Sequence, residues 1–144
     1  MPDAQAIAAE LRAAYDESWE VGRRRVATYF ADQVEVRHQP PLPQDGVKPG
    51  PQVEAESVAE FGAYKTLLTD FREETTIRAD GEQVRCDVVL AGRLADGAEV
   101  RAPVQQILTV REGAAVKTEV IIAPDVLAQL VEIVRAGGKP VDLG

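Results

Sequence analysis

Residues 71–122 decide the fold, and they read FREETTIRADGEQVRCDVVLAGRLADGAEVRAPVQQILTVREGAAVKTEVII. Apolar and polar residues alternate along this stretch in long runs, as they do in half-buried strands. An acidic residue followed by Gly separates the runs, and Asp-Gly between alternating runs is a strong hairpin signal. The pattern therefore predicts a meander of antiparallel strands at residues 71–79, 83–95, 99–111 and 115–122.

The N-terminal half is patterned mainly for helices. Apolar residues recur at helical spacing over residues 4–20, and Gly22 is expected to end that helix. A short helix over 23–31 and a longer one over 53–69 are predicted in the same way. The inward face of the longer helix should hold Val58, Phe61, Tyr64 and Leu68.

Three further segments complete the order of elements. Residues 34–38 alternate as a strand does, and the segment 40–51 is so rich in Pro and Gly that it is predicted to be a loop. A last helix should begin at Pro124 and end at Gly137-Gly138. Strands that are segregated from helices predict an α+β fold. We expect a single domain over residues 1–144, with N-terminal helices, an antiparallel sheet and a C-terminal helix.

Charge and composition narrow the class of function. The 144-residue chain has 16 Lys and Arg against 24 Asp and Glu, a net charge of −8 that argues against nucleic acid as a partner. The Arg run at 23–25 is interpreted as a solvated helix face. One His, one Cys and scattered acids give no metal-ligand spacing, so neither metal nor cofactor is expected. No apolar stretch reaches the roughly 18 residues of a membrane span and residues 1–10 lack signal-peptide features, so a cytoplasmic protein is expected.

A family resemblance rests on the order of elements and on three short segments. Phe30-Ala31-Asp32 leads into the strand at 34–38, residues 97–103 run from Gly97 to Pro103, and a last strand follows Arg111-Glu112-Gly113. The chain resembles the nuclear transport factor 2-like superfamily, and within it the SnoaL-like polyketide cyclases. The resemblance implies a cone: a curved sheet wrapped around helices, with a pocket at the open end. This fold hosts isomerases, cyclases, epoxide hydrolases and binding modules, so function depends on the site.

His38 is the only histidine and the first candidate for catalysis. Strand parity places it on the face of Val34 and Val36, so it should point into the cone. A neutral imidazole there can act as a general base near neutral pH. In the ketosteroid isomerase-like proteins, the resemblance implies a general-base carboxylate at the position of His38. Because a histidine replaces the carboxylate in this chain, that chemistry is not carried over intact.

Donors that polarise a ligand carbonyl are expected on the strand at 99–111. Residues 102–105 resemble the segment in which those isomerases hold a protonated acid, and Gln105 takes the matching position. Strand parity places Gln106 on the same inward face as Val104 and Leu108, which would turn Gln105 outward. A bulge at Pro103 would shift this alternation by one residue and turn Gln105 inward. Both glutamines therefore remain candidates. Tyr15 on the first helix could add a phenol donor.

A second set of residues resembles the limonene epoxide hydrolases. That likeness implies an Arg that bridges two carboxylates. Here Arg85 and the first carboxylate, Asp87, lie on one strand. Ile121 occupies the matching place of the second carboxylate, so Glu119, two residues earlier, replaces it only if the register of that strand shifts. Gln39 would supply the loop amide that orients a water. Alternation usually sends the apolar set to the core, which would turn Arg85 and Asp87 outward.

Together these residues predict a small-molecule protein with an apolar pocket for a polyketide-, steroid- or terpenoid-like ligand. The main hypothesis is proton transfer beside a carbonyl by an isomerase- or cyclase-type enzyme. One alternative is epoxide hydrolysis by Arg85, Asp87 and Glu119. The other is a non-catalytic ligand-binding or dimerisation module, since an outward apolar face or the last helix could be buried in a homodimer. The aromatic residues expected to contact the ligand are Trp19, Phe30, Phe61 and Tyr64.

Overall fold

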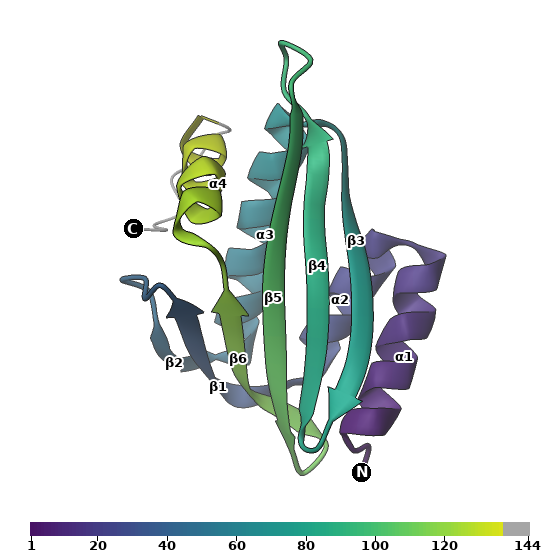
Figure 1. Ribbon diagram of the computed structural model, residues 1–144. Coiled ribbons are helices and arrows are strands. Elements are labelled where there is room, and N and C mark those ends of the chain that lie inside the picture. The colour runs from purple at the N-terminus through teal and green to yellow at the C-terminus, as the bar shows by residue number, and fades with distance from the viewer. Residues whose placement is uncertain (137–144) are drawn as a thin grey trace.

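The computed structural model describes residues 1–136 and confirms the α+β class (Figure 1). Three helices, α1 to α3, lie on one face of a six-stranded sheet, and α4 packs against α3 and β5. The elements are α1 (Ala4–Glu17), α2 (Trp19–Thr28), β1 (Phe30–Gln39), β2 (Gly46–Pro49), α3 (Gly50–Leu67), β3 (Thr69–Asp80), β4 (Gln83–Arg93), β5 (Glu99–Arg111), β6 (Ala114–Ile121) and α4 (Pro124–Ala136).

The predicted meander is confirmed, but the sheet is mixed. β3, β4, β5 and β6 pair antiparallel in sequence order, and Gly81 and Gly97 take positive φ angles of 60° and 88° at two of the turns. The strand order is β2-β1-β6-β5-β4-β3, and β1 runs parallel to β6. The expectation of a wholly antiparallel sheet is therefore wrong for this pair, because a pairing between distant segments leaves no local sequence pattern.

The first two helices divide at Ser18. Its backbone is extended, and its hydroxyl accepts a hydrogen bond of 3.1 Å from the Val21 N–H, which caps α2. Gly22 lies inside α2, where the Tyr15 ring occupies the space of a Cβ atom, at 2.3 Å from its ideal position. The prediction that Gly22 ends the first helix is wrong, since this glycine permits close packing and does not terminate the helix.

The Pro-rich segment contains more regular structure than predicted. β2 pairs with β1 at the edge of the sheet, where Pro is tolerated, and Pro51 lies in the first turn of α3, where its missing N–H is not needed. Val58, predicted to face inward, is 67% exposed, whereas Tyr64 on the same helix is fully buried. The predicted helix end at Gly137-Gly138 lies outside the described residues.

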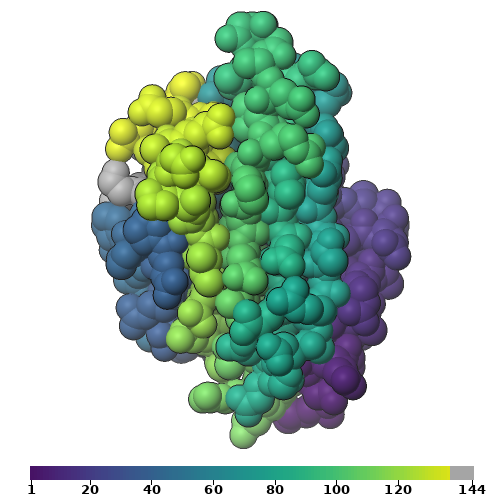
Figure 2. All heavy atoms as spheres, in the orientation of Figure 1, coloured from purple at the N-terminus to yellow at the C-terminus, as the bar shows by residue number. Residues whose placement is uncertain are grey.

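The two faces of the sheet differ in chemistry. The concave face packs apolar side chains against α1 to α3, whereas the outer face carries ion pairs such as Arg101 with Glu74 at 2.7 Å. Figure 2 shows this outer face, with the side chains of β3 to β5 at the surface and no helix over them. Within residues 1–136, no helix combines the length and the apolar character that a membrane crossing requires.

We expect Gly22→Ala to destabilise the protein by about 1–3 kcal/mol, because the new methyl group would overlap the Tyr15 ring. Gly62→Ala on α3 is the matched control, since its Cβ would meet no atom within 4 Å. That control should stabilise the protein by about 0.5–1 kcal/mol, the usual gain of Ala over Gly in a helix. Chemical denaturation measures both changes, and a stabilised Gly22→Ala protein would contradict the packing described here.

Candidate functional site

A cavity of about 540 Å³ lies between α2, α3 and the concave face of the sheet. This volume is typical of pockets for small molecules, which are about 300–1,000 Å³. Its wall is mainly apolar, and the polar side chains that line it come from six segments of the chain. The interior polar groups are Arg23, His38, Gln44, Glu60, Gln106 and Thr118.

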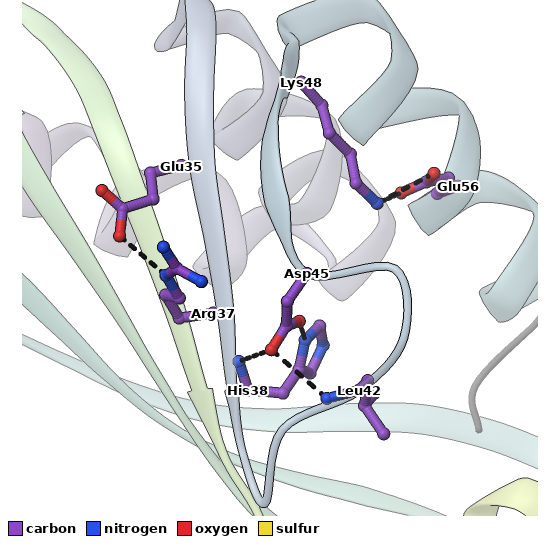
Figure 3. Close-up of polar contacts among 7 residues, drawn as sticks. All are labelled: Glu35, Arg37, His38, Leu42, Asp45, Lys48 and Glu56. Atoms are coloured by element: carbon purple, nitrogen blue, oxygen red, sulfur yellow. Dashed lines mark hydrogen bonds and ion pairs between the residues drawn. The ribbon is translucent and has the colours of Figure 1, made fainter.

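His38 lines the cavity near the end of β1, as strand parity predicts, and Asp45 holds its ring (Figure 3). The Asp45 Oδ1 atom lies 2.5 Å from His38 Nδ1. The other oxygen, Oδ2, accepts hydrogen bonds from the backbone N–H groups of His38 at 3.0 Å and Leu42 at 3.3 Å. Both partners are largely buried, with 16% and 10% of their side chains exposed. The carboxylate therefore fixes the imidazole and the loop together.

The charge on Asp45 determines which ring nitrogen of His38 can act as a base. Burial opposes that charge, but the hydrogen bonds from His38 and Leu42 outweigh it and lower the pKa of Asp45. An ionised carboxylate only accepts hydrogen bonds, so Nδ1 of a neutral His38 must carry the hydrogen. The lone pair is then on Nε2, which is the arrangement of a histidine general base.

Arg23, which lines the cavity, belongs to a buried ion pair with Glu73. Arg23 donates to Glu73 through Nε at 3.2 Å and Nη2 at 2.7 Å, and through Nη1 to Gln106 Oε1 at 3.3 Å. The Glu73 side chain is completely buried and 20% of Arg23 is exposed. Burial opposes the charge on Arg23, yet Glu73 beside it raises its pKa above the usual value. The interpretation of residues 23–25 as a wholly solvated face is therefore wrong for Arg23.

Glu60 and Tyr64 lie one turn apart on α3 and both line the cavity. The Tyr64 hydroxyl donates a hydrogen bond of 2.7 Å to Glu60 Oε1. Burial raises the pKa of Glu60, against the opposing influence of this hydrogen bond and of the positive charge on Arg23. The cavity thus holds a carboxyl group that is more readily protonated than an exposed one.

The structure distinguishes between the two glutamines. Gln106 lies in the cavity, and its Nε2 donates to Thr118 Oγ1 at 3.2 Å. Gln105 lies on the outer face, where its Nε2 donates to Asp87 at 3.4 Å. The pairing of β4 with β5 is unbroken through Pro103, so the suspected bulge is absent from this ladder and simple parity holds. Gln105 is therefore removed from the expected site.

Two aromatic residues predicted for the site, Tyr15 and Trp19, pack away from the cavity. The Tyr15 hydroxyl donates to Glu73 Oε1 at 3.5 Å behind the cavity wall, and burial raises its pKa. Trp19 packs edge-on against Phe71 with ring centroids 5.2 Å apart. Neither residue is among those that line the cavity. Phe30, Phe61 and Tyr64 do line it, and their contact with a ligand stays a prediction.

The residues of the epoxide hydrolase hypothesis are not brought together at the cavity. Arg85 pairs with Asp80 at 3.2 Å, Asp87 with Arg78 at 3.1 Å, and Glu119 with Lys117 at 3.6 Å. They lie on the outer face because alternation buries the intervening side chains of β4, Cys86 and Val88, on the concave face. This set therefore supplies no carboxylate pair facing a ligand.

Sequence reasoning missed Asp45, Glu60 and the inward-facing pair Arg23 and Glu73. For Glu73 a signal was available, because parity places it on the face of Phe71 and Ile77. For Glu60 the spacing to Tyr64 is that of helix neighbours, which pattern analysis assigned only to core packing. Asp45 lies in a segment read as loop, where no periodicity indicates the direction of a side chain.

Solved structures share this arrangement of elements. A nuclear transport factor 2-like protein from Burkholderia thailandensis aligns over 90% of this chain and 98% of its own, with a TM-score of 0.64 and 17% identity. The chain has the nuclear transport factor 2-like fold. A proposed SnoaL-like polyketide cyclase from a Jannaschia species aligns over 97% of this chain and 98% of its own, with a TM-score of 0.63 and 15% identity.

The same nuclear transport factor 2-like fold is found in a Catenulispora acidiphila protein with a ketosteroid isomerase-like fold, solved in complex with trimethylamine. It aligns over 83% of this chain and 91% of its own, with a TM-score of 0.55 and 14% identity. No protein-family model and no curated protein matches the chain. The cone expected from the resemblance is confirmed, and the activity depends on the residues of the cavity.

We expect Glu73→Gln to lower the free energy of unfolding by about 3–5 kcal/mol, because it leaves the charge of Arg23 buried without a counterion. Glu74→Gln is the matched control on the adjacent, outward-facing position, where 44% of the side chain is exposed. It should have a far smaller effect, because exposed salt bridges contribute little. Urea denaturation measures both changes in the free energy of unfolding. Equal effects would contradict a larger contribution of the buried ion pair to stability.

Proposed function

We propose that this protein is an enzyme that transfers a proton beside the carbonyl group of an apolar, ring-sized ligand, with His38 as the general base. The observation that supports this most directly is the contact between Asp45 and His38 Nδ1 in the cavity wall. An imidazole held by a carboxylate is oriented, and its protonated form is stabilised once it has accepted a proton.

The cavity favours a neutral and mainly apolar ligand. Aliphatic and aromatic side chains such as Phe30, Val88 and Leu130 make up most of the wall. The cation of Arg23 is already neutralised by Glu73, so it offers little attraction to an anionic ligand. A polyketide-, steroid- or terpenoid-like ring system fits this description, and the polyketide cyclase and ketosteroid isomerase-like descriptions of the structural neighbours favour the same class.

In the proposed reaction, His38 Nε2 removes a proton from the carbon next to the carbonyl group. The electron pair of that C–H bond moves to the carbonyl oxygen and forms an enolate, while Asp45 stabilises the imidazolium. Gln106 can support the oxygen through the N–H that it does not donate to Thr118. Return of the proton to another carbon of the conjugated system gives an isomer and restores neutral His38.

Proton exchange tests this step without knowledge of the natural ligand. The bicyclic ketone β-tetralone in deuterated water should exchange the hydrogens next to its carbonyl faster with the protein than without it, as followed by proton NMR. His38→Gln should slow the catalysed exchange by about a hundredfold or more, since a general base contributes about 10²–10⁴. Asp45→Asn should slow it as well, because the imidazole loses its orienting carboxylate.

Arg37→Gln is the matched control for these variants. Arg37 adjoins His38 on β1 but lies on the opposite side of the strand, paired with Glu35 at 2.8 Å (Figure 3). It should exchange β-tetralone at the wild-type rate. Exchange that survives His38→Gln would exclude His38 as the base. Binding of ring ketones with no exchange in any of them would contradict the enzyme and favour a ligand-binding module.

A further inference from the structure

The cavity contains a second titratable cluster, on a different wall from His38. Glu60 and Tyr64 belong to α3, whereas His38 belongs to β1 and Asp45 to the loop that follows it. Resting on the proposed function, we propose that Glu60 is the acid that donates a proton to the carbonyl oxygen of the ligand, and that Tyr64 is its positioning residue. The cluster then narrows the ligand class to neutral ketones that can form an enol.

The geometry leaves one oxygen of Glu60 free for a ligand. Oε1 accepts the hydrogen bond of 2.7 Å from the Tyr64 hydroxyl, and Tyr64 is itself completely buried. Oε2 has no hydrogen-bond partner among residues 1–136, although Glu60 lines the cavity. A protonated carboxyl can accept at one oxygen and donate from the other. Glu60 can therefore keep its bond to Tyr64 while its O–H points to a ligand.

Other carboxyl groups of the interior are already committed. Both oxygens of Glu73 accept from Arg23, and the oxygens of Asp45 are taken up by His38 and Leu42. Gln106 has one N–H left, but an amide is a weaker donor than a carboxylic acid. Glu60 is thus the strongest donor that these polar groups of the cavity wall can present to an oxygen atom.

The surroundings of Glu60 support its role as an acid. Burial raises its pKa, and the negative charge of Glu73 acts in the same direction. The Tyr64 hydroxyl and the positive charges of Arg23 and His38 act against this, but the net direction is upward. Because a carboxyl group with a raised pKa keeps its proton to higher pH, the donor is present at low pH and is lost as pH rises through that pKa.

Protons and electrons balance in the combined step. His38 Nε2 forms an N–H bond with the hydrogen of the breaking C–H bond, and the freed electron pair forms a C=C bond. The carbonyl oxygen takes the proton of Glu60, so the ligand becomes a neutral enol. Glu60 is left negative and His38 positive, and these charges attract each other. In the second half both residues recover their original states as the ketone forms again with its double bond moved.

Binding of β-tetralone, a neutral ring ketone whose oxygen can only accept a hydrogen bond, isolates the role of Glu60 from that of the base. The titration is followed by isothermal calorimetry in the His38→Gln background, so the imidazole does not contribute to the pH dependence. Affinity should fall about tenfold between about pH 5 and pH 9 as Glu60 loses its proton, the value of one hydrogen bond of ordinary strength. With Glu60→Gln added, affinity should be independent of pH.

Two further variants make the result interpretable. Glu20→Gln removes an exposed carboxylate that pairs with Lys65 of α3 at 3.2 Å, and should keep the wild-type pH dependence. Tyr64→Phe keeps the Glu60 carboxyl but removes its positioning bond, and should weaken β-tetralone binding with the pH dependence retained. If Glu60→Gln fails to fold, as thermal unfolding would show, the infrared C=O band of a protonated carboxyl in the wild-type protein gives the same information when β-tetralone labelled with carbon-13 at its carbonyl group shifts it.

The outcomes separate the two proposals. A β-tetralone affinity that keeps its pH dependence in the Glu60→Gln variant, or a wild-type protein without the shifted carboxyl band, would overturn the role of Glu60 even if His38→Gln abolishes exchange of β-tetralone. A pH-dependent affinity that Glu60→Gln abolishes would support Glu60 even if exchange survives the loss of His38. For both residues to act together, Glu60→Gln must also slow β-tetralone exchange by about tenfold or more.

Discussion

The ion pair between Arg23 and Glu73 is the interaction on which the rest of the interior depends. It joins α2 to β3, the edge strand, and it does so with both charges largely removed from solvent. Such a pair is tolerated only when its hydrogen bonds are satisfied, and here the carboxylate receives two of them and Gln106 a third. The guanidinium also lies over the Phe61 ring at 4.6 Å. The charged Arg23 side chain that lines the cavity is therefore held by partners on β3 and β5, within a wall that is otherwise mainly apolar.

The proposed chemistry comes from one continuous stretch of chain. His38 lies near the end of β1, Asp45 directly precedes β2, and Glu60 lies in α3. Residues 38–60 therefore supply the proposed base, its orienting carboxylate and the proposed acid. The Pro-rich segment between 40 and 51 is what places them. It returns the chain along β1 as β2 and then begins α3 over the concave face. A segment with little periodicity thus determines how the polar groups meet.

Local patterns could predict the outline of the fold but not its interior. Alternation and Asp-Gly turns indicate the meander, and the same parity correctly directs His38 and Gln106 inward and Arg85 outward. Long-range features leave no such pattern, as the parallel pairing of β1 with β6 and the ion pair of Arg23 show. Other errors arose because one residue type can serve two purposes. Gly22 permits contact with Tyr15, and Ser18, with no apolar signal of its own, divides the helices.

The place of β6 in the sheet has a consequence for how the protein is made. β6 lies between β1 and β5, so it is the strand that connects the β1–β2 hairpin to the meander of β3, β4 and β5. Among the described residues it is also the last strand to be synthesised. Until then β1 has only the four-residue β2 as a partner, and His38 has no neighbour at Val120. The concave face that lines the pocket is therefore complete only once β6 has been synthesised and has paired with both β1 and β5.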